Sequence, residues 1–391
     1  MSIRTTFRQL LFPVFLPTFC AFVSLRASLI LLPLYILNQG YGVTLAASII
    51  SIRGIGMLFM DLPAGFLVSR LGDKGGMLVG NVAAALSLFL FATFDSPVMF
   101  VLISLLSGAA FSVMMLSRLS YVGKKCDPHE RGRVIAFMAS LQRIGGIIGP
   151  IGGGFIATFF GFVPALIALG AFALLAALNI LICCENTPCC QNREMRSHAF
   201  VRTLRENKRI FLTSGIGAIG ITSLRGASPL LVTLFGSVLE LTPAEIGFFA
   251  SLATILEFIM FLPAGYIMDK WGRKFTIIPG TLIMAVSLVI LTYSNNLAGY
   301  VVGTLIMAFG NGLATGVIMS IAADLAPENY RGQFLGVWRF VCDLGFSGGP
   351  LFITGIMSFI GLGASAVVLG GVSSCFAVVM WVFAKESMVK E

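Results

Sequence analysis

The chain has 391 residues, of which 57% are hydrophobic and only 11% charged, and its mean hydropathy is +0.96. Soluble globular proteins carry about 25% charged residues, so this composition excludes a soluble enzyme, and its apolar content excludes intrinsic disorder. The formal net charge of +9 does not indicate a nucleic-acid partner, because the basic residues lie in alternate gaps between apolar stretches instead of on one soluble face.

Apolar stretches long enough to cross a bilayer follow one another along the chain. The predicted spans are residues 10–37, 44–68, 76–94, 97–121, 134–158, 161–183, 210–236, 244–268, 275–293, 298–323, 333–357 and 362–384. The first stretch is too long for a cleavable signal peptide. We therefore expect an all-α integral membrane protein of twelve transmembrane helices. Its predicted parts are a six-helix bundle over 1–184, a cytoplasmic linker over 185–209 and a second six-helix bundle over 210–391.

Lys and Arg gather in every second gap, whereas the intervening gaps carry only Asp95, Glu240 and Glu245. This positive-inside pattern predicts that both termini lie in the cytoplasm. Short loops and the absence of an N-x-S/T sequon favour a bacterial inner membrane.

The eight cysteines predict no metal site, because the cluster at 183–190 does not have zinc-ligand spacing. In or beside cytoplasmic loops these thiols are expected to stay reduced. The two histidines, His129 and His198, are placed in loops, which excludes a histidine proton relay inside the membrane. No cofactor is expected.

The two halves of the chain are repeats of each other at a shift of 200 residues. Pro63, Gly65, Gly72 and Lys74 coincide with Pro263, Gly265, Gly272 and Lys274, and Gly145, Gly149 and Pro150 coincide with Gly345, Gly349 and Pro350. At a shift of 199, Ser24-Leu25-Arg26 coincides with Ser223-Leu224-Arg225. Parallel six-span repeats are typical of secondary transporters, whose substrate site lies near the membrane midplane between the halves.

The segment PAGYIMDKWGRK at 263–274 resembles the loop signature of the major facilitator superfamily, G-x-x-x-D-K/R-x-G-R-K. The first-half copy departs from it, with Ser69 in place of the acid and Asp73 in place of the Arg. GGIIGPIGGG at 145–154 resembles the Gly-Pro motif of that family's drug:proton antiporters, although Ser104 stands where their fourth-span Arg is expected. The resemblance implies two pseudo-symmetric bundles that alternate their access.

These motifs supply two sets of predicted functional residues. A cytoplasmic gate is assigned to Gly65, Arg70, Asp73, Lys124, Gly265, Asp269, Arg273 and Asp324. Close helix packing and bending are assigned to Gly145, Gly149, Pro150, Gly153 and Gly154.

Within the gate, the repeat reverses both charges of one pair, because Asp73 and Lys124 correspond to Arg273 and Asp324. We therefore expect the contacts Asp73–Lys124 and Arg273–Asp324. The alternative is four solvated loop residues.

Charged residues inside the spans are costly and should face a cavity or a partner. They are Arg26, Arg53, Arg118, Arg143, Arg225, Arg339, Asp61, Glu257 and Asp343. Similar membrane depth, with the span pairing of the family, suggests the ion pairs Arg53–Asp343 and Arg143–Glu257 between the halves. The alternative is a local pair Arg339–Asp343, with Glu257 a packed neutral acid.

Arg26 and Arg225 occupy equivalent positions near the middle of the first and seventh spans. Two cations facing one cavity would be stabilised by an anion, so an anionic substrate is predicted there, with Asn311 and Met115 as further contacts. The alternatives are that each Arg caps backbone carbonyls or pairs with Glu257 or Asp61, and that Asn311 and Met115 only pack.

Glu257 is the first candidate for proton coupling, followed by Asp343 and Asp61, because burial raises a carboxyl pKa. We therefore expect a monomeric, proton-coupled exporter of a small or amphipathic organic anion, not an enzyme, whose partners are its substrate, protons and the lipid bilayer. The alternatives are broad multidrug efflux, lipid or glycolipid flipping, and a non-transporting membrane receptor.

Overall fold

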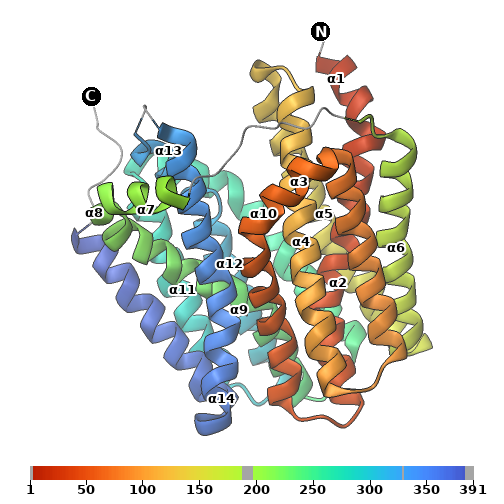
Figure 1. Ribbon diagram of the computed structural model, residues 1–391. Coiled ribbons are helices and arrows are strands. Elements are labelled where there is room, and N and C mark those ends of the chain that lie inside the picture. The colour runs from red at the N-terminus through yellow and green to blue at the C-terminus, as the bar shows by residue number, and fades with distance from the viewer. Residues whose placement is uncertain (1–2, 187–196, 328–329, 384–391) are drawn as a thin grey trace. The chain divides into compact units, whose positions relative to one another are not determined.

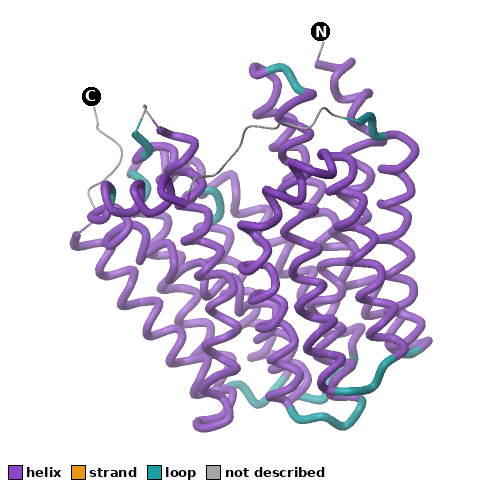
Figure 2. Tube along the Cα trace, viewed as in Figure 1, coloured by secondary structure: helices purple, strands orange, loops and turns teal. Residues whose placement is uncertain are grey.

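The computed structural model describes residues 3–186, 197–327 and 330–383, and in these ranges the chain is helical apart from short connections (Figures 1 and 2). The first half contains α1 Ile3–Leu10, η1 Leu11–Phe15, α2 Leu16–Asn38, α3 Val43–Thr93, α4 Pro97–Lys125, α5 Pro128–Phe160 and α6 Phe162–Cys183. The second half contains α7 Ser197–Glu206, α8 Lys208–Ile210, η2 Phe211–Gly215, α9 Ile216–Val238, α10 Pro243–Trp271, α11 Lys274–Tyr293, α12 Leu297–Ala314, α13 Val317–Leu325 and α14 Arg331–Phe383. The segments η1 and η2 are single π-helical turns.

Three glycines with positive φ divide the longest helices. Gly72 (φ 74°) breaks α3, Gly361 (φ 80°) breaks α14, and Gly316 (φ 87°) separates α12 from α13. Glycine accepts this backbone conformation without strain because it has no Cβ. Each break in α3 and α14 falls between two predicted spans, so each of these helices supplies two membrane crossings.

Among the described residues, eleven helical stretches are long and apolar enough to cross a membrane. One of them, Gln333–Phe383, contains the break at Gly361 and covers the last two predicted spans. Large apolar side chains such as Leu262 and Phe359 are more than 80% exposed, which suits a surface covered by lipid. The predicted all-α membrane fold is confirmed.

The chain divides into two compact units, each described here by itself. Unit one comprises Met1–Arg193 with Leu241–Ser251, and unit two comprises Glu194–Glu240 with Leu252–Glu391. The first turns of α10 thus belong with unit one, where Ser251 donates a hydrogen bond to the carbonyl of Ile147 on α5 at 2.7 Å. Part of the predicted linker, residues 187–196, lies outside the described residues, and its second half contains the helix α7.

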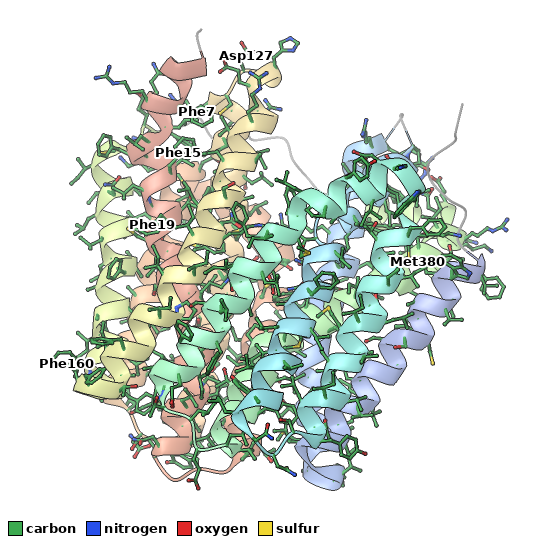
Figure 3. All side chains as sticks on the ribbon, turned by 180° about the vertical axis from the view of Figure 1, so that it is seen from behind. Phe7, Phe15, Phe19, Asp127, Phe160 and Met380 are labelled. Atoms are coloured by element: carbon green, nitrogen blue, oxygen red, sulfur yellow. The ribbon has the colours of Figure 1, made fainter. Side chains whose placement is uncertain are left out.

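In unit one, α2 packs against α5 and α6, and α3 packs against α4 and α6. Gly145, Gly149 and Gly153 face α2, and a Cβ at Gly149 would lie 2.4 Å from the carbonyl oxygen of Val23. α5 runs as one α-helix through Pro150, so the visible role of this motif is close packing. Phe15 is buried in this unit near the end that carries Asp127, whereas Phe160 lies at the opposite end (Figure 3).

Unit two repeats this packing with α9 against α14. A Cβ at Gly349 would lie 2.0 Å from the carbonyl oxygen of Ser223, and a Cβ at Gly226 would lie 1.9 Å from that of Phe346. Gly349 and Gly149 are equivalent in the repeat, so the same glycine position brings the first and fifth helices of each half together.

Candidate transport and gating sites

Each half contains an ion pair at the predicted gate positions. Lys124 Nζ lies 2.7 Å from Asp73 Oδ2 in unit one, and Arg273 Nε lies 3.0 Å from Asp324 Oδ2 in unit two. The Asp73 side chain is fully buried, so this pair is not a contact between solvated loop residues. The break at Gly72 places Asp73 at the start of the next helical segment, facing α4. A gating role for these pairs stays a prediction.

Arg273 contacts two carboxylates, Asp324 and Asp269. Its Nη1 also donates to Asp269 Oδ1 at 3.1 Å, one turn earlier in the chain. Partial burial lowers the pKa of this guanidinium, but the hydrogen bonds to Asp324 and Asp269 outweigh that effect and raise it above its usual value. The second-half signature therefore holds three charged groups together.

The other predicted gate residues include Arg70, Gly65 and Gly265. Arg70 lies over the ring of Phe66, 4.4 Å from its centroid, and is exposed. Gly65 and Gly265 have open space where a Cβ would lie.

Sequence reasoning assigned no role to Arg131 and Arg331, which occupy equivalent positions of the two halves. Arg131 donates to the carbonyl of Gly123, and Arg331 donates to that of Ala323 at 3.4 Å. Each Arg thereby ties the start of the fifth span to the end of the fourth. The repeat contained this signal, since all four positions coincide at a shift of 200.

A carboxylate on the second span of each half accepts a hydrogen bond from the fourth span. In unit one, Ser112 Oγ on α4 donates to Asp61 Oδ1 on α3 at 2.5 Å. In unit two, Asn311 Nδ2 on α12 donates to Glu257 Oε1 on α10 at 2.7 Å. Asn311 was predicted as a substrate contact, and the structure places its amide on the proton-coupling candidate Glu257.

Asp343, the other coupling candidate in unit two, lies 3.5 Å from Arg339 Nε on the same helix, as in the local pair left open above. The proposed pairs Arg53–Asp343 and Arg143–Glu257 join residues of different units and stay predictions.

Arg26 and Arg225 lie on the least covered facet of two otherwise buried helices. Arg26 is the exposed side chain of α2 between Pro17 and Ile36, and Leu25 and Leu29 beside it are half-buried. On α9 the half-buried facet is formed by Arg225, Ser228 and Pro229.

The electrostatic surroundings of these two Arg differ. Arg26 lies close enough to Arg53 to repel its charge. In unit two, the charges of Arg225, Arg339 and Asp343 lie close enough to the thiol of Cys342 to interact with it.

Arg118 is buried inside unit one, with 4% of its surface exposed. Its Nη1 donates to Thr18 Oγ1 at 3.0 Å, its Nη2 contacts the sulfur of Met115, and its guanidinium lies 5.3 Å from the centroid of the Phe22 ring. Met115, predicted as a substrate contact, is therefore also a partner of Arg118.

The sequence matches the family model described as Major Facilitator Superfamily over residues 14–188 and 210–390. The chain is 24% identical over 361 residues to the "Multi-drug resistance efflux pump PmrA homolog" of Lactococcus lactis, covering 89% of this chain and 88% of that protein. It is 23% identical to the "Multidrug resistance protein MdtH" of Yersinia pestis, covering 81% and 78%. An uncharacterized MFS-type transporter of Methanocaldococcus jannaschii is 27% identical over 128 residues, which is 33% of each chain.

Solved transporter structures share the fold. A POT family transporter in complex with 5-aminolevulinic acid superposes with a TM-score of 0.79 at 15% identity, covering 95% of each chain. The nucleoside transporter NupG superposes with a TM-score of 0.79 at 15% identity, covering 97% of this chain and 100% of that one. These matches, with the repeated bundles described above, show that the chain is a multi-pass membrane transporter belonging to the major facilitator superfamily.

Proposed function

We propose that this transporter exports amphipathic organic anions in exchange for protons. The observation that carries the proposal is the position of Arg26, which is exposed at mid-span on the one open facet of a buried helix. A guanidinium at this depth is costly unless it faces a cavity or a partner of opposite charge. It also binds carboxylate and phosphate groups in bidentate geometry.

The intramembrane carboxylates each have a polar or charged neighbour within their own half. Asp61 accepts from Ser112, Glu257 accepts from Asn311, and Asp343 lies beside Arg339. The spans contain six Arg and three acids, so positive charge is in excess. An anionic substrate would offset this excess, whereas a cationic substrate would add to it.

The proton-binding role is assigned to Glu257. It is half-buried on α10, and the amide of Asn311 holds one of its oxygens. If proton binding here and anion binding at Arg26 favour opposite conformations, each drives the other across the membrane.

The outward direction is supported by the relatives, two of which are named as a multidrug resistance efflux pump and a multidrug resistance protein. The Gly-Pro motif at 145–154 points to the same branch of the family.

The direct test is a binding screen of organic anions on the purified protein, with Arg26→Ala and Arg26→Lys compared with wild type. We expect Arg26→Ala to weaken anion binding by about tenfold or more, as for a lost charge-assisted hydrogen bond, and Arg26→Lys to retain part of it. Equal binding by all three proteins would refute the assignment of Arg26.

The names of the relatives favour broad multidrug efflux as a second candidate function. The two functions differ in charge selectivity. A pump of the second kind would bind lipophilic cations as well as anions in the same screen, and Arg26→Ala would improve cation binding.

A further inference from the structure

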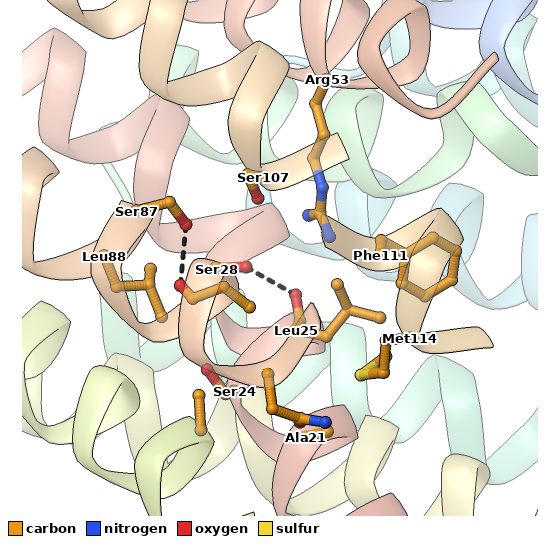
Figure 4. A pocket seen from close by; sticks show the side chains of 13 residues that line it. Ala21, Ser24, Leu25, Ser28, Arg53, Ser87, Leu88, Ser107, Phe111 and Met114 are labelled. Atoms are coloured by element: carbon orange, nitrogen blue, oxygen red, sulfur yellow. Dashed lines mark hydrogen bonds between the residues drawn. The ribbon is translucent and has the colours of Figure 1, made fainter. Parts of the chain in front are cut away.

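A small cavity with a mainly apolar surface and several polar side chains lies in unit one, between α2, α3, α4 and α6. Its volume is about 30 Å³, and a water molecule requires about 10–15 Å³ measured in this way. Its polar lining comes from Arg53, Asn81, Ser24, Ser28, Ser87 and Ser107, and none of its thirteen lining residues is acidic (Figure 4).

Arg53 supplies the charge of this cavity. The residue is 9% exposed, and its guanidinium points into the space between Ser107, Leu25 and Phe111 (Figure 4). Its Nη1 atom is buried without a hydrogen-bond partner among the described residues. The guanidinium carbon lies 6.0 Å from the centroid of the Phe111 ring.

An Arg side chain stays protonated in proteins, so this buried charge needs compensation. Water in the cavity would hydrate the guanidinium but would not neutralise it. Arg26 increases this need for a compensating negative charge, because its own positive charge repels that of Arg53. The buried Arg118 differs in its hydrogen bonding, because both of its terminal nitrogens have a side-chain acceptor, Thr18 for Nη1 and Met115 for Nη2.

The remaining lining suits an anion. Ser107 lies near the guanidinium (Figure 4), Ser24 also lines the cavity, and hydroxyl groups can donate to an anion. Leu88, Phe111 and Met114 close the other sides with apolar surface, which strengthens an electrostatic contact. The volume admits an ion of halide size and is too small for an organic carboxylate with its carbon chain.

We propose that this cavity is a binding site for a small inorganic monovalent anion of the chloride class, held by Arg53. The site lies within the first bundle and neutralises Arg53 there, in place of the pair Arg53–Asp343 that the sequence suggested. In the proposed function, Arg26 is the cation that faces the substrate. Chloride is then a structural ion of the transporter and not its cargo, whatever the charge of the substrate.

The test measures the apparent melting temperature of the purified full-length protein in potassium chloride, potassium bromide and potassium gluconate at equal ionic strength. A ligand of the folded state raises this temperature in a saturable manner. We expect the halides to do so and gluconate, which is too large for the cavity, to have no effect. Arg53→Gln should raise the apparent chloride dissociation constant about tenfold or more, whereas the control Arg118→Gln, which removes another buried guanidinium of the same bundle, should leave it unchanged.

A second measurement decides the matter if Arg53→Gln does not fold. Crystals of the wild-type protein grown in bromide should show an anomalous difference peak in the cavity beside Arg53 Nη1. A cavity that contains no bromide peak, or a melting temperature that is the same in chloride and gluconate, would mean that water alone fills it and would overturn the proposal. A halide effect that survives in Arg53→Gln would overturn it equally.

Discussion

The two halves share a backbone plan but carry their membrane-embedded charges at different positions. Arg53 and Arg118 are buried in the first half, whereas Glu257 and Asn311 form the polar contact of the second. At a shift of 200 residues, each of these four positions coincides with an apolar residue of the other half. The equivalent residues are Ala253, Ile318, Met57 and Phe111, respectively. Helix packing has therefore been kept while charge has been redistributed. The first half contains two buried guanidinium groups, Arg53 and Arg118, and in the second half the proposed proton carrier is Glu257.

The features that the halves share are those that depend on backbone approach. The glycine contacts between α2 and α5 recur between α9 and α14, and a π-helical turn precedes α2 and α9. In lipid, close approach of helices supplies packing that apolar side chains cannot, because lipid tails are equally apolar. The shared framework and the divided charge lead to different expectations for mutation.

The largest effect is expected where the halves are alike. Gly149→Ala and Gly349→Ala would each force a Cβ against a backbone carbonyl, at 2.4 Å from Val23 O and 2.0 Å from Ser223 O. Overpacking of this kind costs about 1–3 kcal/mol or more, so both variants should lose most of their folded yield in size-exclusion chromatography. Gly152→Ala and Gly348→Ala, with open space at the Cβ, are the controls and should behave as wild type. Loss of folded yield in only one of the two variants would show that the two glycine positions are not equivalent in packing.

The next largest effect is expected to differ between the two halves. Glu257→Gln keeps the hydrogen bond from Asn311 but cannot exchange a proton. We expect pH-driven transport in proteoliposomes to fall on the order of 100-fold, as for loss of an essential proton-transfer group, while substrate exchange at equal pH persists. Asp61→Asn should reduce pH-driven transport by less than about tenfold. The matched control, Glu245→Gln at the start of the same helix α10, should be active, because its side chain only caps Thr242. An inactive Asp61→Asn beside an active Glu257→Gln would reverse the assignment.

The ion pairs Asp73–Lys124 and Arg273–Asp324 should differ in strength, because Asp73 is fully buried whereas the Asp324 side chain is 28% exposed. Lys124→Ala should destabilise the protein by about 2 kcal/mol, below the 3–5 kcal/mol of a fully buried pair because Lys124 is partly exposed. Asp324→Ala should cost about 1 kcal/mol or less. Thermal unfolding measures both. Restored stability in the double reversal Asp73→Lys with Lys124→Asp would show that opposite charge is what matters, and failure to restore it would point to a steric requirement.

The smallest effect concerns thiol labelling in a Cys189→Ser, Cys190→Ser background. Cys183, exposed at the end of α6, should react with a membrane-impermeant maleimide in inside-out vesicles. Burial raises the pKa of the Cys184 thiol, so at pH 8 less thiolate is present and Cys184 should react more slowly than Cys183. Cys375, exposed on a membrane span of the second half, should be shielded by lipid. Labelling of Cys183 from the outside of intact cells would contradict the predicted topology.

Hydropathy was sufficient to predict the spans, because backbone hydrogen bonding leaves the helix as the structure for a long apolar segment in lipid. The contacts of Asp73 with Lys124 and of Arg273 with Asp324 were predictable as well, since contact between the partners is the simplest reason for a double sign reversal between repeats. The break at Gly316 was not predicted, because the sequence does not show which of the 44 glycines adopt a positive φ angle. The partners of Arg118 and the cavity at Arg53 depend on the meeting of side chains from several helices, which no spacing within one span reveals.

The central claim is that the transporter moves an anion against protons through Arg26. The most direct measurement compares uptake of a fluorescent amphipathic carboxylate and its uncharged amide into proteoliposomes under an imposed pH gradient. The account predicts that the carboxylate accumulates, that the amide does not, and that Arg26→Ala loses this difference while Arg26→Lys keeps part of it. Equal accumulation of both compounds by the wild type, or an unchanged preference in Arg26→Ala, would contradict it.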